Sequence, residues 1–244
     1  MDILGPYNYD AAVREVATWV YQKKQDIHPR ELMLVGLEGL TSSGKSTFSE
    51  ALEGNIRSRG LEGLQIEGDS FHQGSKKANR AIQEAIALVE SGRPLPEGLI
   101  QQIWREEEIR NQIMGWCKDF NASQRERGEL ALHNLLKFKE EGSEHSKTYG
   151  ISRDTILLLS SAYLRHIPGF DLMIYFDVFP DVSAERKVQR DKQRGIQRDP
   201  EIPRKMVKLI EYPLMLRQIE RFPLDPKNSI TVDINDFEKI YLKK

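Results

Sequence analysis

Apolar and polar positions along the chain follow two patterns. Short segments rich in apolar residues lie at 32–37, 64–67, 155–159, 172–177 and 230–232. The near-continuous runs among them are typical of parallel strands that are buried on both faces of a sheet. Helical spacing marks other segments, for example Val13, Val16, Ala17 and Val20. Because strands and helices alternate, we predict an α/β protein, a three-layer α/β/α sandwich with a doubly wound, mainly parallel sheet.

The whole chain is expected to form one domain. Residues 1–30 are predicted to carry an N-terminal helix, with Asn8 or Asp10 as its cap. Residues 73–150 are predicted to be a helical insertion, because apolar residues recur there at helical spacing. One of these stripes consists of Leu130, Leu132, Leu135 and Leu136.

Three further elements are predicted from local composition. The polar segment 142–147 is expected to be a loop. A helix over roughly 204–221 is expected to kink near Pro213, because proline removes a backbone donor. The last residues, 236–242, are expected to form a terminal helix.

Composition and charge exclude several classes of protein. The 244 residues are 39% hydrophobic and 30% charged with a net charge of −1, which does not favour a general nucleic-acid or membrane-surface binder. Cys117 is the single cysteine, so an intrachain disulfide cannot form. The sequence shows no apolar run long enough to span a membrane and no secretory signal. We therefore expect a cytoplasmic protein without nucleic-acid or membrane partners.

A glycine-rich segment follows the first predicted strand. Residues 39–46 read Gly-Leu-Thr-Ser-Ser-Gly-Lys-Ser, the G-x-x-x-x-G-K-[ST] pattern of a phosphate-binding P-loop. The glycines let successive N–H groups turn towards an anion, and the following helix adds its positive dipole end. A strand-to-helix turn without a ligand would not account for Lys45 and Ser46. The predicted nucleotide-binding residues here are Gly39, Thr41, Ser42, Ser43, Gly44, Lys45, Ser46 and Thr47.

Two residues are candidates for the chemistry beside this loop. Ser46 is expected to offer its hydroxyl to Mg²⁺. Asp69 follows the second predicted strand, so its carboxylate is expected at the same edge of the sheet. It could accept the proton of an attacking hydroxyl or hold Mg²⁺ through water. The alternative interpretation of Asp69 is a helix N-cap.

A basic helical segment carries three arginines at intervals of four residues. Arg186, Arg190 and Arg194 would share one face of a helix, where they repel one another unless an anion lies among them. Phosphoryl transfer needs such cations to hold the polyphosphate. The alternative is a solvated face on which nearby acidic residues pair with the arginines.

Together these segments resemble the uridine kinase and phosphoribulokinase family of P-loop kinases. The resemblance rests on the P-loop, on Gly68-Asp69-Ser70-Phe71-His72 and on Arg190-Asp191-x-x-Arg194-Gly195, and it covers roughly residues 32–72 and 150–235. It implies the P-loop NTPase fold, a lid at 183–199 over ATP, an acceptor-binding insertion, and Asp69 serving the acceptor hydroxyl. One position departs from the family, because Ser160-Ser161 stands where an acidic residue and a glycine are usual.

The acceptor is poorly specified by the sequence. The candidate substrate-binding residues are Asp69, His72, Lys76, Arg80, Tyr149 and Arg165. Basic residues such as Lys76 and Arg80 could hold an anionic group, although a solubilising surface is the alternative.

These observations predict a kinase that uses ATP and Mg²⁺ to phosphorylate a hydroxyl of a nucleoside, sugar or similar metabolite. Lys45, Asp69 and Arg190 are the expected catalytic residues, and Ser46 and Asp69 the metal-side ligands. The departure at Ser160-Ser161 leaves open a nucleotide-binding regulator or inactive kinase relative. A GTPase-type switch is disfavoured, because the sequence has no N-K-x-D segment for guanine. The expected partner is a small hydroxylated molecule. The sequence leaves open whether the protein forms a homodimer.

Overall fold

The computed structural model describes residues 2–27, 31–67, 75–100, 106–134 and 145–244. The strands are β1 (Ile3–Tyr7), β2 (Met33–Gly39), β3 (Glu62–Glu67), β4 (Arg127–Asn134), β5 (His145–Ser152), β6 (Thr155–Ser161), β7 (Leu172–Asp177), β8 (Ser229–Asp233) and β9 (Ile240–Lys243). The helices are α1 (Tyr9–Ile27), α2 (Lys45–Arg57), α3 (Ser75–Glu90), α5 (Glu106–Ala122), α6 (Pro180–Gln193), α7 (Glu201–Lys205), a π-helical turn η2 (Met206–Glu211) and α8 (Tyr212–Arg221).

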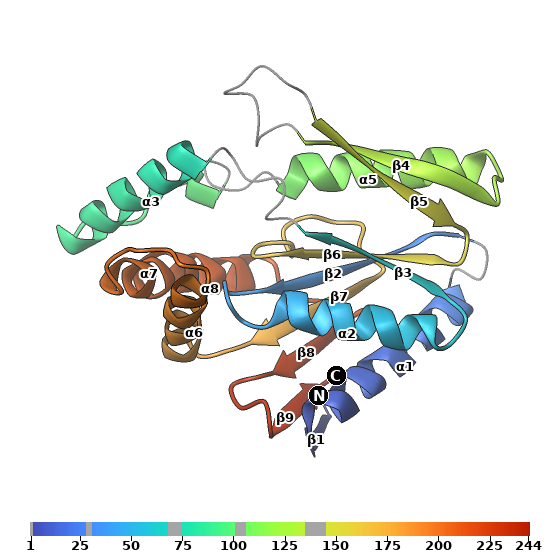
Figure 1. Ribbon diagram of the computed structural model, residues 1–244, viewed down its shortest axis with the longest axis horizontal. Coiled ribbons are helices and arrows are strands. Elements are labelled where there is room, and N and C mark those ends of the chain that lie inside the picture. The colour runs from blue at the N-terminus through green and yellow to red at the C-terminus, as the bar shows by residue number, and fades with distance from the viewer. Residues whose placement is uncertain (1, 28–30, 68–74, 101–105, 135–144) are drawn as a thin grey trace.

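Seven strands form the main sheet in the order β1-β9-β8-β7-β2-β6-β3 (Figure 1). The five strands from β8 to β3 are parallel, and β9 and β1 extend the sheet as antiparallel edge strands. β2 is central, with all seven of its residues buried. This confirms the mainly parallel sheet, and the continuous apolar runs are explained by burial on both faces.

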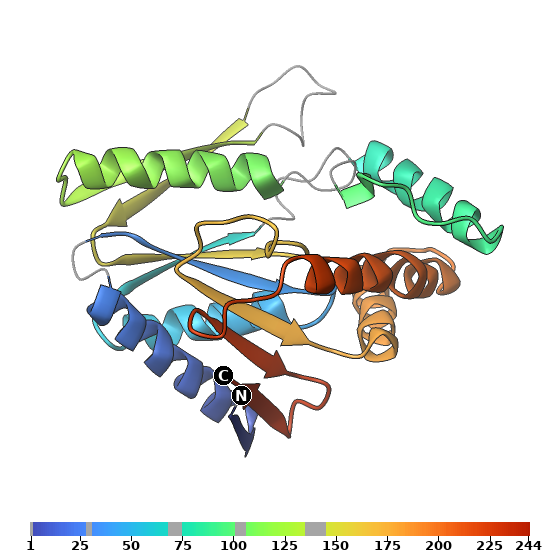
Figure 2. The same cartoon turned by 180° about the vertical axis from the view of Figure 1, so that it is seen from behind.

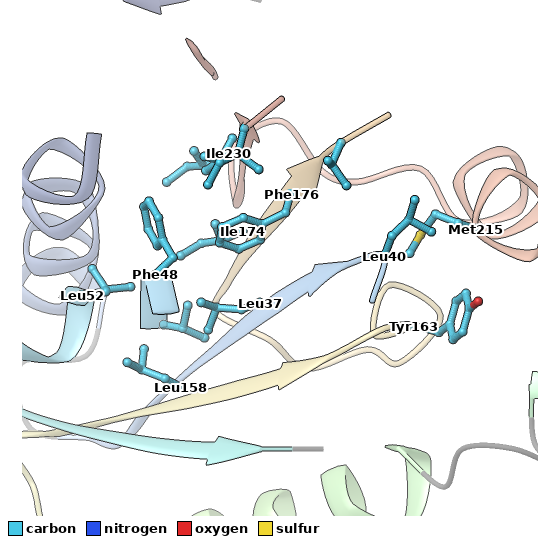
Figure 3. Close-up of a cluster of buried hydrophobic side chains, with 14 of the residues drawn as sticks. Leu37, Leu40, Phe48, Leu52, Leu158, Tyr163, Ile174, Phe176, Met215 and Ile230 are labelled. Atoms are coloured by element: carbon cyan, nitrogen blue, oxygen red, sulfur yellow. The ribbon is translucent and has the colours of Figure 1, made fainter. Parts of the chain in front are cut away.

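The two faces of the sheet carry separate hydrophobic clusters. Helices α1 and α2 cover one face, where Phe48, Leu37 and Ile174 belong to the larger cluster (Figure 3). The other face is covered by α5 and by the antiparallel hairpin β4–β5, as Figure 2 shows from behind. The three layers are therefore present, with the second outer layer made partly of strand.

The hairpin corrects the expectation that residues 73–150 are helical. Leu130 and Leu132 lie in β4, where both side chains are buried against the sheet. Their spacing of two residues places them on one face of a strand, and it was misread as part of a helical stripe. The expected loop at 142–147 is also partly wrong, since β5 begins at His145.

Near the two ends of the chain, the structure has two strands, β1 and β9, that the sequence did not predict. The predicted terminal helix at 236–242 is wrong, because residues 240–243 form β9. Strand β1, which the sequence interpretation missed, pairs with β9. The N-terminal helix is confirmed as α1, and Asn8 caps it by accepting a hydrogen bond from the Ala11 N–H at 2.9 Å.

The predicted helix at 204–221 is present as the continuous series α7, η2 and α8. Pro213 cannot donate to the preceding turn, and the Tyr212 N–H bonds to the carbonyl of Val207, five residues back. The predicted irregularity is thus a widened π-helical turn, a feature often found at functional sites. Within the described residues, no helix is long and apolar enough to cross a membrane.

The buried side chain of Lys24 connects α1 with two other segments of the chain. It is 1% exposed, and its ammonium donates to the carbonyl of Glu31 and, at 2.9 Å, to that of Arg153. Burial lowers its pKa to about 8, against the attraction of Asp154, Asp171 and Glu31.

The low pKa of Lys24 predicts a pH dependence of stability. Between pH 8 and the ordinary lysine pKa of about 10.4, the unfolded chain binds more protons than the folded one. The free energy of unfolding of the wild type should therefore rise with pH relative to that of Lys24→Met in this window. Urea denaturation of both proteins at half-unit pH steps measures the difference. Parallel pH profiles would contradict a lowered pKa of Lys24 in the folded protein.

Candidate functional site

The loop after β2 has the backbone conformation that the glycines were expected to supply. A side chain at Gly39 would place its Cβ atom 2.9 Å from the Phe176 Cβ and carbonyl oxygen, so only glycine fits. Gly44 has a φ of 95°, which glycine adopts without strain, and α2 begins at the next residue. Ser42 is also left-handed, with a φ of 54°. The loop therefore ends directly on the N-terminus of α2, where helix N–H groups have no intrahelical acceptor.

Lys45 folds back over this loop. Its Nζ atom lies 2.7 Å from the carbonyl oxygens of both Gly39 and Leu40, and 3.3 Å from the Ser43 Oγ. A single positive charge is thus held inside the curve of residues 39–44. The hydroxyl-bearing residues Ser46 and Thr47 are exposed in the first turn of α2. The Lys45 ammonium and the N-terminus of α2, with the exposed Ser46 and Thr47, therefore follow directly on the carboxyl end of β2.

The tip of the loop, Thr41, is held by residues from two other elements. Its N–H donates to the Oε2 of Glu211 at 3.1 Å, and its carbonyl accepts from the hydroxyl of Ser183. Its own hydroxyl lies 3.5 Å from the Nη2 of Arg190. The sequence interpretation missed Glu211 and Ser183, which lie 170 and 142 residues from Thr41 in the sequence. Helix α6 and the turn η2 thus fix the position of the tip of the loop.

The three arginines of the predicted lid have different environments. Arg190 lies beside Thr41, and its Nε is buried without a hydrogen-bond partner in the part of the chain that the structure describes. Arg186 donates to the carbonyls of Ile234 and Asn235 and stacks 4.2 Å above the Phe237 ring. Arg194 follows the end of α6 and is exposed. The structure therefore brings Arg190 to the loop and fixes Arg186 beside it.

An aromatic surface adjoins the start of α2. A Cβ atom on Gly44 would lie 3.6 Å from the ring of Phe237 and 3.5 Å from Ile234, so the segment between β8 and β9 packs beside the loop. Phe237 is 42% exposed, which leaves much of its ring open to solvent. Together with the guanidinium of Arg186, it offers a flat surface next to the phosphate loop.

Only part of the predicted acceptor side falls within the described residues. Asp69 and His72 lie outside the described residues, as does the side chain of Lys76. Arg80 is exposed on α3 and pairs with Glu84 at 2.8 Å. Tyr149 lies in β5 and packs against the cluster beneath the hairpin.

Among the predicted substrate-binding residues that the structure describes, Arg165 has the environment that differs most from the expectation. Its side chain is 3% exposed and forms an ion pair at 2.8 Å with Glu38, which is fully buried in β2. The other oxygen of Glu38 accepts from the N–H groups of Leu164 and Arg165. The guanidinium also lies 4.6 Å from the centre of the Tyr175 ring. Arg165 is therefore an internal support, and a glutamate inside an apolar strand was the sequence signal that could have indicated it.

Ser160 and Ser161, where the resemblance leads one to expect an acidic residue and glycine, are both buried at the end of β6. Ser161 is in register with Glu38, and Ser160 with Glu67 of β3. A glutamate therefore lies beside these serines on each neighbouring strand, Glu38 on β2 and Glu67 on β3. The carboxylate of Glu38 is already paired with Arg165.

Comparison with known proteins identifies the fold. No family model and no curated relative matches the sequence. Among solved structures, D-glycerate 3-kinase from Cryptococcus neoformans var. grubii is 13% identical, covering 92% of this chain and 96% of its own, with a TM-score of 0.59. A protein from Silicibacter sp. TM1040, proposed to be a fructose transport system kinase, is 20% identical, covering 90% and 98%, with a TM-score of 0.57.

A third structure, a possible uridine kinase from Bacillus stearothermophilus, is 15% identical, covering 86% of this chain and 94% of its own, with a TM-score of 0.50. Identities this low show the fold alone. The α/β fold expected from the sequence is thereby confirmed, and these three structures share it.

Proposed function

Because the chain has the fold of the P-loop kinases, we propose that it transfers the γ-phosphoryl group of ATP to a hydroxyl of a small metabolite. The observation that carries this proposal is the position of Lys45, whose ammonium lies inside the curve of the loop at the N-terminus of α2. An ammonium and a set of helix N–H groups directed at one point are suited to a polyphosphate.

The surrounding residues fit an adenine nucleotide. Buried donors without a partner among the described residues include the Ser42 hydroxyl and the Nε of Arg190, and both belong to groups beside the loop. We assign the loop N–H groups, Lys45 and Arg190 to the phosphates. The flat surface of Phe237 and Arg186 is assigned to the base, which aromatic rings and guanidiniums stack against.

The hydroxyl oxygen at the start of α2 is also a suitable ligand for Mg²⁺. Ser46 presents a hydroxyl at the first turn of α2, and Mg²⁺ prefers oxygen ligands shared with substrate phosphates. When bound, the ion would neutralise charge on the β- and γ-phosphates. Asp69, two residues beyond the end of β3, is assigned to orient and deprotonate the acceptor hydroxyl.

The assignment of Asp69 predicts a specific loss of turnover. Asp69→Asn should lower kcat by about 100-fold or more, because a positioned general base contributes at least that factor. The Kd for ATP should change little, since the loop and Lys45 are untouched. Steady-state kinetics and calorimetry measure the two effects, with Asp119→Asn on the exposed side of α5 as control. Unchanged turnover of Asp69→Asn on the true acceptor would remove Asp69 from the mechanism.

The activity itself is tested by a metabolite screen. Purified protein, ATP and Mg²⁺ are incubated with nucleosides, sugars and other hydroxylated metabolites, and mass spectrometry detects the gain of one phosphate. A phosphorylated product that Lys45→Ala does not form supports the kinase. The buried pair Ser160-Ser161 favours a second candidate, a nucleotide-binding regulator. ATP binding without product across the panel would support that candidate instead.

A further inference from the structure

Helix α2 packs directly on strand β3, which is the edge strand of the main sheet (Figure 1). A Cβ atom on Gly63 of β3 would lie 2.7 Å from the Cγ atom of Glu53 in α2. β3 is parallel to β6 and, through it, to β2, whereas α2 begins after the carboxyl end of β2 and runs back along the sheet. Residues that precede Glu53 in α2 therefore lie beside residues that follow Gly63 in β3.

The spacing of these two elements brings Ser46 level with the end of β3. Ser46 and Glu53 are two helical turns apart and share one face of α2, and Gly63 and Glu67 share one face of β3. Two turns of helix measure about 10 Å, which is the length of about three strand residues. Ser46 thus lies level with the last residues of β3, where Glu67 is on the face that carries α2.

The side chains between these two positions agree with this alignment. Ser49 lies between Ser46 and Glu53 and is 0% exposed, so this face of α2 is turned to the sheet. Its Oγ and the Nε2 of Gln65, which precedes Glu67 on the same face of β3, are both buried without a hydrogen-bond partner among the described residues. Polar groups therefore continue along this interface to the carboxyl edge, where Ser46 and Glu67 are both exposed.

Glu67 is paired in register with Ser160 of β6. Ile156 and Leu158 of β6 belong to the hydrophobic cluster beneath α2, so Ser160, two residues further along, is on that same face. Ser160 carries no charge, which leaves Glu67 as the carboxylate on this face at the ends of β3 and β6. Two strand spacings, about 10 Å, separate β3 from β2, so this carboxylate is suited to act through water at the loop.

The other carboxylates at the ends of the described parallel strands are engaged. Glu38 of β2 is held in a buried ion pair at 2.8 Å. Asp177 of β7 and Asp233 of β8 lie 3.4 and 3.7 Å from the ammonium of Lys243. Within the residues that the structure describes, the carboxylate of Glu67 has neither an ion pair nor a hydrogen bond. It is therefore available to a cation at this edge of the sheet.

We propose that Glu67 is a metal-side residue of the nucleotide site, whose carboxylate holds Mg²⁺ through water beside Ser46. This inference rests on the proposed function and adds one residue to it. Mg²⁺ keeps several waters and is usually bound by one or two carboxylates together with phosphate oxygens. Glu67 then serves the metal, and Asp69 is left to the acceptor hydroxyl.

The test is the affinity for Mn²⁺, used in place of Mg²⁺ because electron paramagnetic resonance measures its free concentration. The protein is held in excess over a non-hydrolysable ATP analogue, so that all of the analogue is bound. Glu67→Gln should weaken Mn²⁺ binding about tenfold or more, because loss of an outer-shell partner of a metal typically costs a factor of about 10–100. Its affinity for the analogue without metal should equal that of the wild type.

The matched control is Glu129→Gln, which removes an exposed carboxylate from β4 and should leave both affinities unchanged. The double variant Glu67→Gln/Ser160→Asp places a carboxylate at the paired position of β6, on the same face, and should restore most of the Mn²⁺ affinity. Thermal unfolding establishes that each variant is folded.

Two results of the single variant would overturn the inference. One is wild-type Mn²⁺ affinity in Glu67→Gln. The other is an equal loss of analogue affinity without metal, which would assign Glu67 to the structure of the loop. A wild type that binds the analogue with Mn²⁺ but phosphorylates nothing would overturn the kinase proposal alone, whereas absence of analogue binding would overturn both.

Discussion

Lys45→Ala is expected to abolish detectable phosphorylation and to weaken ATP binding by about 100-fold or more. The reason is that the ammonium lies 2.7 Å from two loop carbonyls, at the point on which the loop and the N-terminus of α2 converge. Loss of one preorganised donor to a developing charge typically costs a factor of about 10²–10³ in turnover. Calorimetry with ATP and a product assay with the identified acceptor measure the two effects.

The matched control for this variant is Lys118→Ala. Lys118 is exposed on α5, which covers the face of the sheet away from α2. This substitution removes the same charge and side chain without touching the loop, so ATP affinity and turnover should stay at wild-type values. Wild-type ATP affinity in Lys45→Ala, in a protein with an unchanged melting temperature, would refute the phosphate site.

Arg165→Met is expected to cause the largest loss of stability among the substitutions considered. Glu38 is fully buried, and the variant removes its only counter-ion in the described structure. Breaking one side of a buried ion pair costs about 3–5 kcal/mol because the remaining charge is uncompensated. For a protein of this size, that corresponds to a melting temperature roughly 10 °C lower. Differential scanning fluorimetry and urea denaturation measure it.

Two further variants separate charge from packing in this prediction. The double variant Glu38→Gln/Arg165→Met removes both charges and should recover much of the loss, since a neutral buried pair carries no uncompensated charge. Arg57→Met breaks an exposed pair with Glu53 on α2 and should cost less than about 1 kcal/mol. An Arg165→Met protein as stable as Arg57→Met would mean that Glu38 finds other compensation.

The sequence was sufficient for the sheet and for the turn at residues 39–46 because both depend on local patterns. Buried parallel strands produce continuous apolar runs, as in β2 and β6, and the loop has a fixed spacing of glycines before Lys45. The β4–β5 hairpin was missed because Leu130 and Leu132 are followed by Leu135 and Leu136, so the same residues also fit a helical stripe.

The contacts that support the site could not be read from local patterns. Glu211 and Thr41 are brought together only by the folded helices, and nothing near Glu211 in the sequence marks it apart from Pro213, which indicated an irregular helix. Arg165 was expected to be available to substrate because it is a cation in a loop. Its burial depends on Glu38, a residue 127 positions away.

The pairing of β1 with β9 has a practical consequence for engineering. The N–H of Asp2 donates to the carbonyl of Lys244 at 2.9 Å, and the N–H of Lys244 donates to the carbonyl of Asp2 at 3.1 Å. Residues 2 and 244 are therefore neighbours at one corner of the sheet (Figure 1). A short peptide linker between them would make the backbone circular without bending either strand. Circular permutants opened at exposed turns such as Ser91–Gly92 would then retain every strand pairing of the sheet.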